Sequence, residues 1–144
     1  MRKGSVYWIL VLFWCVVIFS VTSSPGATSE NTGLVIKAET NVTSNVVSKI
    51  NFGIRKTAHV TLFGVLAILL LLAIGERNNA PLKAWFLATI YGATDEFHQI
   101  FEPGRTPALQ DVGIDSFGAV IALIAFCLLR RLLSKRVALK FRDQ

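Results

Sequence analysis

Charged residues are scarce in this chain. Asp, Glu, Lys and Arg make up 17% of its 144 residues, whereas soluble domains contain about 25%. Hydrophobic residues make up 53%, and the mean hydropathy is +0.55. This composition argues against an ordinary soluble domain and predicts a single small polytopic membrane domain.

Cysteine is scarce as well. Cys15 and Cys127 are the two cysteines, and both lie within apolar runs. Neither belongs to a CxxC pair or to a spacing typical of metal ligands. We therefore interpret both as buried free thiols, which behave as small hydrophobic side chains.

Nucleic-acid binding is a further class that the sequence does not support. The formal net charge is +6, but the basic residues gather towards the termini, and no aromatic and basic motif of the RNA-binding kind is present. We interpret the charge as a signal of membrane topology. The predicted partner is a lipid bilayer, with no nucleic acid.

Apolar stretches predict an all-α integral membrane bundle of four transmembrane helices. They run from Val6 to Val21, from about Thr57 to Gly75, from Leu82 to Phe101 and from about Val112 to Leu129. A helix of about twenty residues spans the roughly 30 Å hydrocarbon core. The third stretch reaches that length only by including Asp95 and Glu96, so these carboxylates are expected to face the protein interior or a wet cavity.

The first and the last stretch each carry a further expectation. Ser24-Pro25-Gly26-Ala27 follows the first stretch, so a cleaved signal peptide is an alternative. The aromatic content and length of that stretch favour a retained helix. In the last stretch, Gly118 and Ala119 form a small-residue patch of the kind that lets membrane helices approach closely.

Basic residues predict the orientation. With four spans, one side of the membrane holds ten of the fifteen Lys and Arg residues: Arg2, Lys3, Arg77, Lys83, Arg130, Arg131, Lys135, Arg136, Lys140 and Arg142. The positive-inside rule then places both termini in the cytoplasm. The long connection before the second span lies outside. Its second half has apolar residues at helical spacing, which predicts an extracytoplasmic amphipathic helix on the membrane surface, leading into that span.

Four polar clusters lie at the outer ends of the predicted spans. They are Arg55-Lys56-x-x-His59, Asp95-Glu96-x-His98-Gln99, Gly104-Arg105 and Asp111-x-x-x-Asp115. An ionisable side chain at the centre of a membrane helix costs about 2.5–3.5 kcal/mol. Such residues are expected to pair, to meet water or to take part in chemistry. We predict that Arg105 lies within salt-bridge reach of at least one of the aspartates or Glu96.

Each cluster also has a structural interpretation. Lys56 and Arg55 suit an interfacial position at a helix entrance, and Asp111 suits a helix N-cap. Asp115 lies inside the apolar run, so capping does not explain it.

Together the clusters resemble the VanZ-like family. The matching pattern extends the clusters with Phe63 four residues after His59, Phe101 two residues after Gln99 and Gly118 three residues after Asp115. The family comprises small bacterial membrane proteins named for one that is encoded with glycopeptide-resistance genes and is associated with low-level teicoplanin resistance. The resemblance covers about residues 5–133, expected to form one transmembrane domain, with a basic cytoplasmic tail at 134–144. It implies the bacterial plasma membrane and a cell-envelope role, and it names no reaction.

Two functions fit the polar clusters. In the first, an outer-leaflet site binds or processes an anionic envelope component, such as a lipid-linked precursor or an anionic lipid, and contributes to teicoplanin resistance. The substrate-binding candidates are Arg55, Lys56, Gln99, Arg105, Asp111 and Asp115. The candidates for proton transfer or orientation are His59, Asp95, Glu96 and His98. No nucleophile motif such as GxSxG is present, so enzymatic activity stays open.

In the second function, the clusters form a structural salt-bridge network, and the protein acts without catalysis through lipid, antibiotic or protein partners. A metal centre built from His59, His98 and carboxylates is less favoured, because the sequence has no close-spaced ligand pair such as HExxH. We therefore assign no metal ligand, and the sequence identifies no cofactor.

Overall fold

The computed structural model describes residues 3–23, 34, 44–101 and 109–142. Within these residues the secondary structure is helical, with no strand. The helices are α1 (Lys3–Thr22), α3 (Ser44–Ile74), α4 (Ala80–Gln99) and α5 (Leu109–Arg142). The all-α bundle predicted from the apolar stretches is confirmed.

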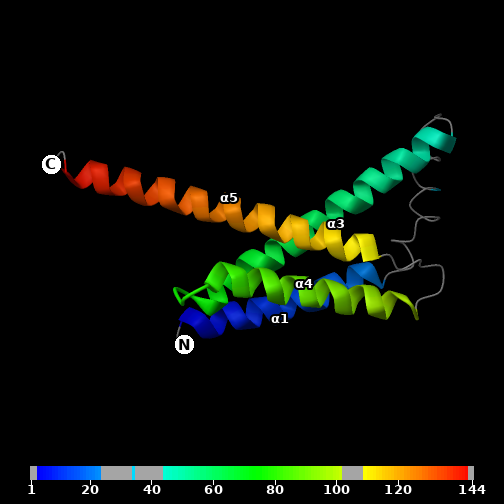
Figure 1. Ribbon diagram of the computed structural model, residues 1–144, viewed down its shortest axis with the longest axis horizontal. Helices are drawn as coiled ribbons and strands as arrows, with labels where there is room; N and C mark the ends of the chain where they lie inside the picture. Colours follow the sequence, from blue (N-terminus) through cyan, green and yellow to red (C-terminus); the bar gives the residue numbers. More distant parts are fainter. Residues whose placement is uncertain (1–2, 24–33, 35–43, 102–108, 143–144) are drawn as a thin grey trace.

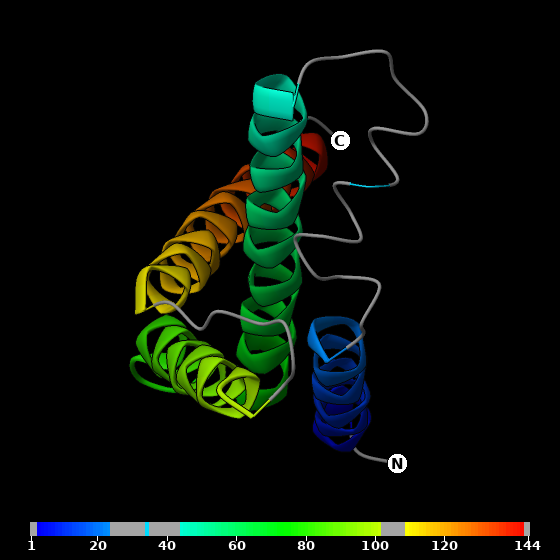
Figure 2. The same ribbon diagram turned by 90° about the vertical axis from the view of Figure 1, so that its right-hand side faces the viewer.

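Helix α3 is the centre of the bundle. It packs against α1, α4 and α5, whereas α1 has few contacts with α4. Figure 2 shows α3 standing between α1 on one side and α4 with α5 on the other. In Figure 1, α3 and α5 cross, and each extends beyond the bundle at one end. Every other helix therefore contacts α3, and α4 also packs extensively against α5.

Three of the four helices are long and apolar enough to cross a membrane. The segments are Gly4–Thr22 of α1, Asn45–Ile74 of α3 and Leu109–Arg136 of α5. Apolar side chains such as Leu12, Phe13 and Ile124 are exposed along them, as expected of helices whose surroundings are lipid. These helices establish the chain as a membrane protein of the helical class.

Helix α4 differs because its buried face is made of small and polar residues. Ala80, Ala84, Ala88 and Gly92 recur every four residues and are buried, and the same face ends in Asp95, Glu96 and Gln99. Small side chains let α4 lie close to its neighbours, and they lower its hydropathy. The 20 residues of α4 extend about 30 Å at about 1.5 Å per residue. That length matches the hydrocarbon core, and a crossing by α4 stays a prediction.

A tight turn joins α3 to α4. Gly75 ends α3 with φ of 72°, and Asn79 precedes α4 with φ of 60°. Positive φ values are accessible to glycine and tolerated by asparagine. Pro81 stands in the first turn of α4, where its missing N–H costs no helical hydrogen bond.

Two helix boundaries differ from the expectation. Residues 44–54 are helical, as predicted, but they continue without interruption into the second span, so α3 is one helix of 31 residues. Likewise α5 is one helix of 34 residues and extends beyond the predicted span of about 112–129, while the cytoplasmic tail at 134–144 stays a prediction. Polar side chains end an apolar run without ending a helix, because the backbone hydrogen bonds do not depend on them.

The crossing of α3 and α5 is tight at Gly118. A Cβ atom added there would lie 2.8 Å from both the Cα and the carbonyl oxygen of Val60. Nearby, a Cβ added to Gly64 would lie 3.0 Å from that of Ala122. The predicted small-residue patch is thus the contact between α3 and α5, and it brings the polar positions just before it on each helix together.

Candidate functional site

Buried polar side chains gather at one end of the bundle. There α1 and α4 end, α5 begins and α3 passes between them (Figure 1). The buried polar and charged residues at this end, called here the polar end, are Thr22, His59, Asp95, Glu96, Gln99, Asp111 and Asp115. The convergence of three of the four sequence clusters is therefore observed directly.

Two pairs of side chains join α3 to α5. Lys56 donates a hydrogen bond to Asp111, and the Nδ1 atom of His59 lies 3.0 Å from Oδ1 of Asp115. The pairs are one helical turn apart on both helices, which places them in a ladder along the crossing. Asp111 lies in the first turn of α5, and its carboxylate bonds Lys56. Its interpretation as an N-cap is therefore wrong, because α5 begins at Leu109.

The inner pair of this ladder is the more deeply buried. The Asp115 side chain is 0% exposed and that of His59 is 9% exposed, compared with 12% for Asp111 and 23% for Lys56. The Oδ2 atom of Asp115 is buried and accepts no hydrogen bond from the part of the chain that the structure describes. His59 is therefore the side chain that stabilises the buried Asp115 carboxylate among the described residues.

The Asp95 carboxylate is held differently, between α1 and α4. Thr22 donates to its Oδ1 atom at 2.7 Å, and the Nε2 amide of Gln99 donates to Oδ2 at 2.9 Å. The Thr22 hydroxyl also lies 2.9 Å from the carbonyl oxygen of Ile18, and its single hydrogen serves one acceptor at a time. Among the described residues, no lysine, arginine or histidine forms a salt bridge with Asp95.

Gly92 brings the two groups of polar residues close together. A Cβ added to Gly92 would lie 3.4 Å from Oδ2 of Asp115 and 3.4 Å from the ring of Phe63. The lack of a side chain thus lets α4 approach the α3–α5 ladder just one turn before Asp95. The ladder and the Asp95 carboxylate share one polar end, on opposite sides of this contact.

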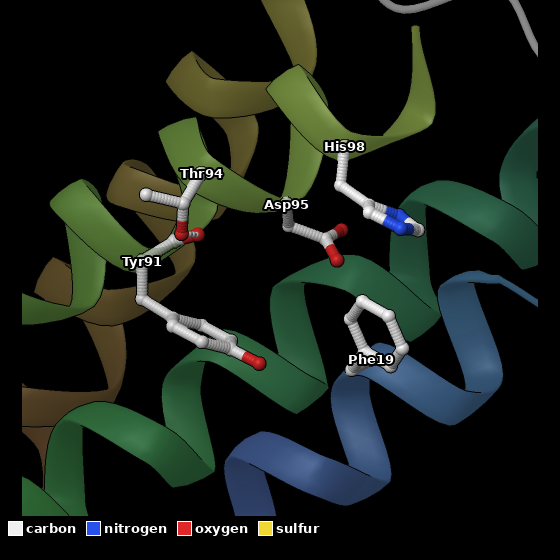
Figure 3. Close-up of a pocket in the computed structure, with 5 residues that line it drawn as sticks. All are labelled: Phe19, Tyr91, Thr94, Asp95 and His98. Atoms are coloured by element: carbon white, nitrogen blue, oxygen red, sulfur yellow. Dashed lines mark hydrogen bonds between the residues drawn. The ribbon is translucent and has the colours of Figure 1, made fainter. Parts of the chain in front are cut away.

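A pocket of about 190 Å³ lies beside Asp95. Its lining comes from the end of α1 and the last turns of α4: Phe19, Tyr91, Thr94, Asp95 and His98. In Figure 3 the Asp95 carboxylate points towards the side of the pocket where the rings of Phe19 and His98 lie, and Tyr91 lies on the other side. The ring centroids of Phe19 and His98 are 4.6 Å apart, so this contact closes one side of the pocket.

The remaining candidates are only partly placed. Glu96 is buried on α4, and Arg55 is half-buried on α3 beside Lys56. Gly104 and Arg105 lie outside the described residues, so the expected salt bridge of Arg105 stays a prediction. Within the described residues, no group of three or more His, Cys, Asp or Glu side chains is arranged to hold a metal ion.

The comparison with known families decides the classification. The model of the VanZ/LLP1 family matches residues 6–130. The chain belongs to the VanZ/LLP1 family. No curated protein and no solved structure matches it. The classification of the chain therefore rests on the family match. The family match includes residues of all four helices and confirms the resemblance drawn from the polar clusters.

Several residues at the polar end of this VanZ-family chain escape sequence reasoning. Thr22 looks like a helix end, and Phe19 like a lipid-facing side chain. Tyr91 and Thr94 do carry a signal, because they precede Asp95 and His98 by one turn each on the same helix. A search for polar groups one helical turn before Asp95 and before His98 would have found these two, whereas the α1 residues depend on how α1 packs.

Proposed function

We propose that this VanZ-family chain is a multi-pass protein of the bacterial plasma membrane, with both termini in the cytoplasm. The ten basic residues on the side of the α3–α4 turn and the termini support this orientation. The polar end then faces the outer leaflet. An orientation of this kind would give extracellular envelope components access to the polar end.

We further propose that the polar end binds an anionic envelope component and contributes in this way to teicoplanin resistance. The observation that carries the proposal is the concentration of buried charge beside a pocket, at one end of helices that are otherwise apolar. Arg55 and Lys56 supply positive charge at this end for phosphate or carboxylate groups. His98 lines the pocket and suits proton exchange near neutral pH.

A second candidate function has its own support. Lys56 and His59 are both engaged with aspartates of α5, as expected of a network that fixes the register of two helices. In this case the polar end is architectural, and the protein acts through lipid, antibiotic or protein partners. The two candidates differ in the expected effect of removing Glu96, which is buried at the polar end, or His98, which lines the pocket.

The discriminating experiment is alanine substitution of Glu96 and of His98. We expect each variant to insert into the membrane at the wild-type level and to lose the resistance phenotype. Breaking a buried structural pair typically costs about 3–5 kcal/mol, so an architectural role would instead lower the amount of membrane-resident protein. If the Glu96→Ala and His98→Ala proteins insert into the membrane and still give the wild-type level of teicoplanin resistance, the binding-site proposal is wrong.

Orientation needs a separate test. We expect a membrane-impermeant thiol reagent to label Ser48→Cys in intact cells and to label Asn78→Cys only after lysis, in a background with Cys15 and Cys127 replaced by alanine. Ser48 and Asn78 are both exposed and lie near opposite ends of α3. Equal labelling of the two positions in intact cells would overturn the proposed topology.

A further inference from the structure

The pocket beside Asp95 has hydrogen-bond acceptors to offer, and its hydroxyl donors are already engaged. The Tyr91 hydroxyl donates to the carbonyl oxygen of Cys15 at 2.6 Å, and that of Thr94 donates to the carbonyl oxygen of Tyr91 at 2.7 Å. Each hydroxyl oxygen keeps lone pairs, as do both carboxylate oxygens of Asp95. The oxygen atoms of Asp95, Tyr91 and Thr94 in this lining therefore suit a hydrogen-bond donor, and His98 is the remaining polar side chain of the lining.

The charge of the pocket points the same way. Asp95 is 4% exposed and receives hydrogen bonds from Thr22 and Gln99, both of which are neutral. No cation of the described residues forms a salt bridge with it. A buried carboxylate is best stabilised by an opposite charge that also donates hydrogen bonds. A phosphate or carboxylate of a ligand would be repelled from this position.

The aromatic lining adds a second attraction for a cation. The ring of Phe19 faces the same space as the Asp95 carboxylate (Figure 3), and cations are attracted to the faces of aromatic rings. Phe19 and Thr94 are exposed at the surface of the bundle. The pocket therefore reaches that surface between α1 and α4, where lipid headgroups or soluble molecules have access.

We propose that this pocket binds a primary ammonium group. The inference rests on the proposed function and deepens it, because the anionic component bound at the polar end then carries an ammonium group as well. The N–H donors of a primary ammonium suit the Asp95 carboxylate, and the Tyr91 and Thr94 hydroxyl oxygens of the same lining also offer lone pairs. A quaternary ammonium has no N–H and cannot make these hydrogen bonds. The source is a headgroup of the bilayer, such as phosphatidylethanolamine, or a soluble amine.

The test uses the full-length protein in nanodiscs with two probes. In the lipid arm, phosphatidylethanolamine is titrated into phosphatidylcholine nanodiscs, and retained lipid is measured by native mass spectrometry. In the soluble arm, ethanolamine or choline is added to phosphatidylcholine nanodiscs, and binding is followed by saturation-transfer NMR. We expect a preference for the primary ammonium in at least one arm. The arm that shows it identifies the source.

Two variants with matched controls locate the binding. Asp95→Asn should weaken binding about tenfold or more, since a charge-assisted hydrogen bond is lost. Phe19→Leu should weaken it about two- to fivefold. The control for the carboxylate is Glu76→Gln, at an exposed position between α3 and α4, and the control for the ring is Phe13→Leu on the exposed face of α1. Both controls should bind as the wild type does.

Several results would overturn the proposal. The first is that neither arm shows a preference for primary over quaternary ammonium. The second is that the wild type, Asp95→Asn and Phe19→Leu bind equally well. The third is a preference that arises only in Arg105→Gln, which would mean that Arg105 itself occupies the pocket. If Asp95→Asn does not fold, Phe19→Leu and its control decide. If His98→Ala loses resistance but the wild-type protein does not bind a primary ammonium group, the proposed function stands and this inference alone is wrong.

Discussion

The ion pairs at the two ends of the α3–α5 contact differ in how deeply they are buried. At the polar end, Asp115 and His59 are buried together. At the other end, Glu76 and Arg130 also form a salt bridge, but their side chains are 81% and 61% exposed. The first pair lies about one turn from the close contact of Gly118 with Val60, and the second joins α5 to the turn that follows α3. Burial therefore decides which pair holds the fold together.

Cavities show the same contrast. A pocket of about 520 Å³ at the opposite end is lined by residues of α1, the end of α3 and the turn before α4, including Tyr7, Trp8 and Arg77. It is larger than the pocket at Asp95, yet none of the described residues that line it is a buried acidic residue. Size alone would favour the larger pocket, whereas chemistry favours the smaller one, because a buried carboxylate gives a ligand a specific partner.

The largest effect is expected from His59→Ala. The variant removes the partner of Asp115, whose other carboxylate oxygen accepts no hydrogen bond from the described residues. We expect a loss of about 3–5 kcal/mol in unfolding free energy, measured by denaturation in detergent micelles. The control is His59→Ala combined with Asp115→Ala. The double variant should lose less than the sum of the two single losses, and additive losses would show that the pair is not coupled.

A smaller effect is expected from Gly118→Ala. The new Cβ would lie 2.8 Å from backbone atoms of Val60, so α3 and α5 must separate, with a loss of about 1–3 kcal/mol, as in overpacked cores. Gly113→Ala on the same helix is the matched control, because nothing lies within 4 Å of its added Cβ. Equal stability of the two variants would contradict the close crossing.

The smallest effect is expected from Glu76→Gln. Its pair with Arg130 is largely exposed, and exposed ion pairs contribute at most about 1 kcal/mol. The same denaturation measurement should find the variant close to the wild type. A loss as large as that of His59→Ala would remove the distinction between the two ends.

Much of this arrangement follows from the sequence, because apolar stretches locate the helices and alternating helix directions bring the polar clusters to one end. Partner choice does not follow. Arg55 and Lys56 are adjacent cations, and the rotation of α3 decides that Lys56 meets Asp111. Likewise the hydrogen bond from Thr22 to Asp95 depends on how α1 packs. The continuity of α3 from Ser44 was missed because hydropathy indicates which residues contact the membrane. A helix can continue through residues that do not contact it.

The central claim is that the Lys56–Asp111 and His59–Asp115 pairs hold α3 and α5 together, while the pocket beside Asp95 binds the ligand. An experimental structure in nanodiscs that contain phosphatidylethanolamine tests this claim most directly. We predict density for a headgroup between Phe19, Asp95 and His98, with the Lys56–Asp111 and His59–Asp115 pairs intact and no ligand between them. A ligand inserted between Lys56 and Asp111, with the pocket beside Asp95 empty, would contradict the account.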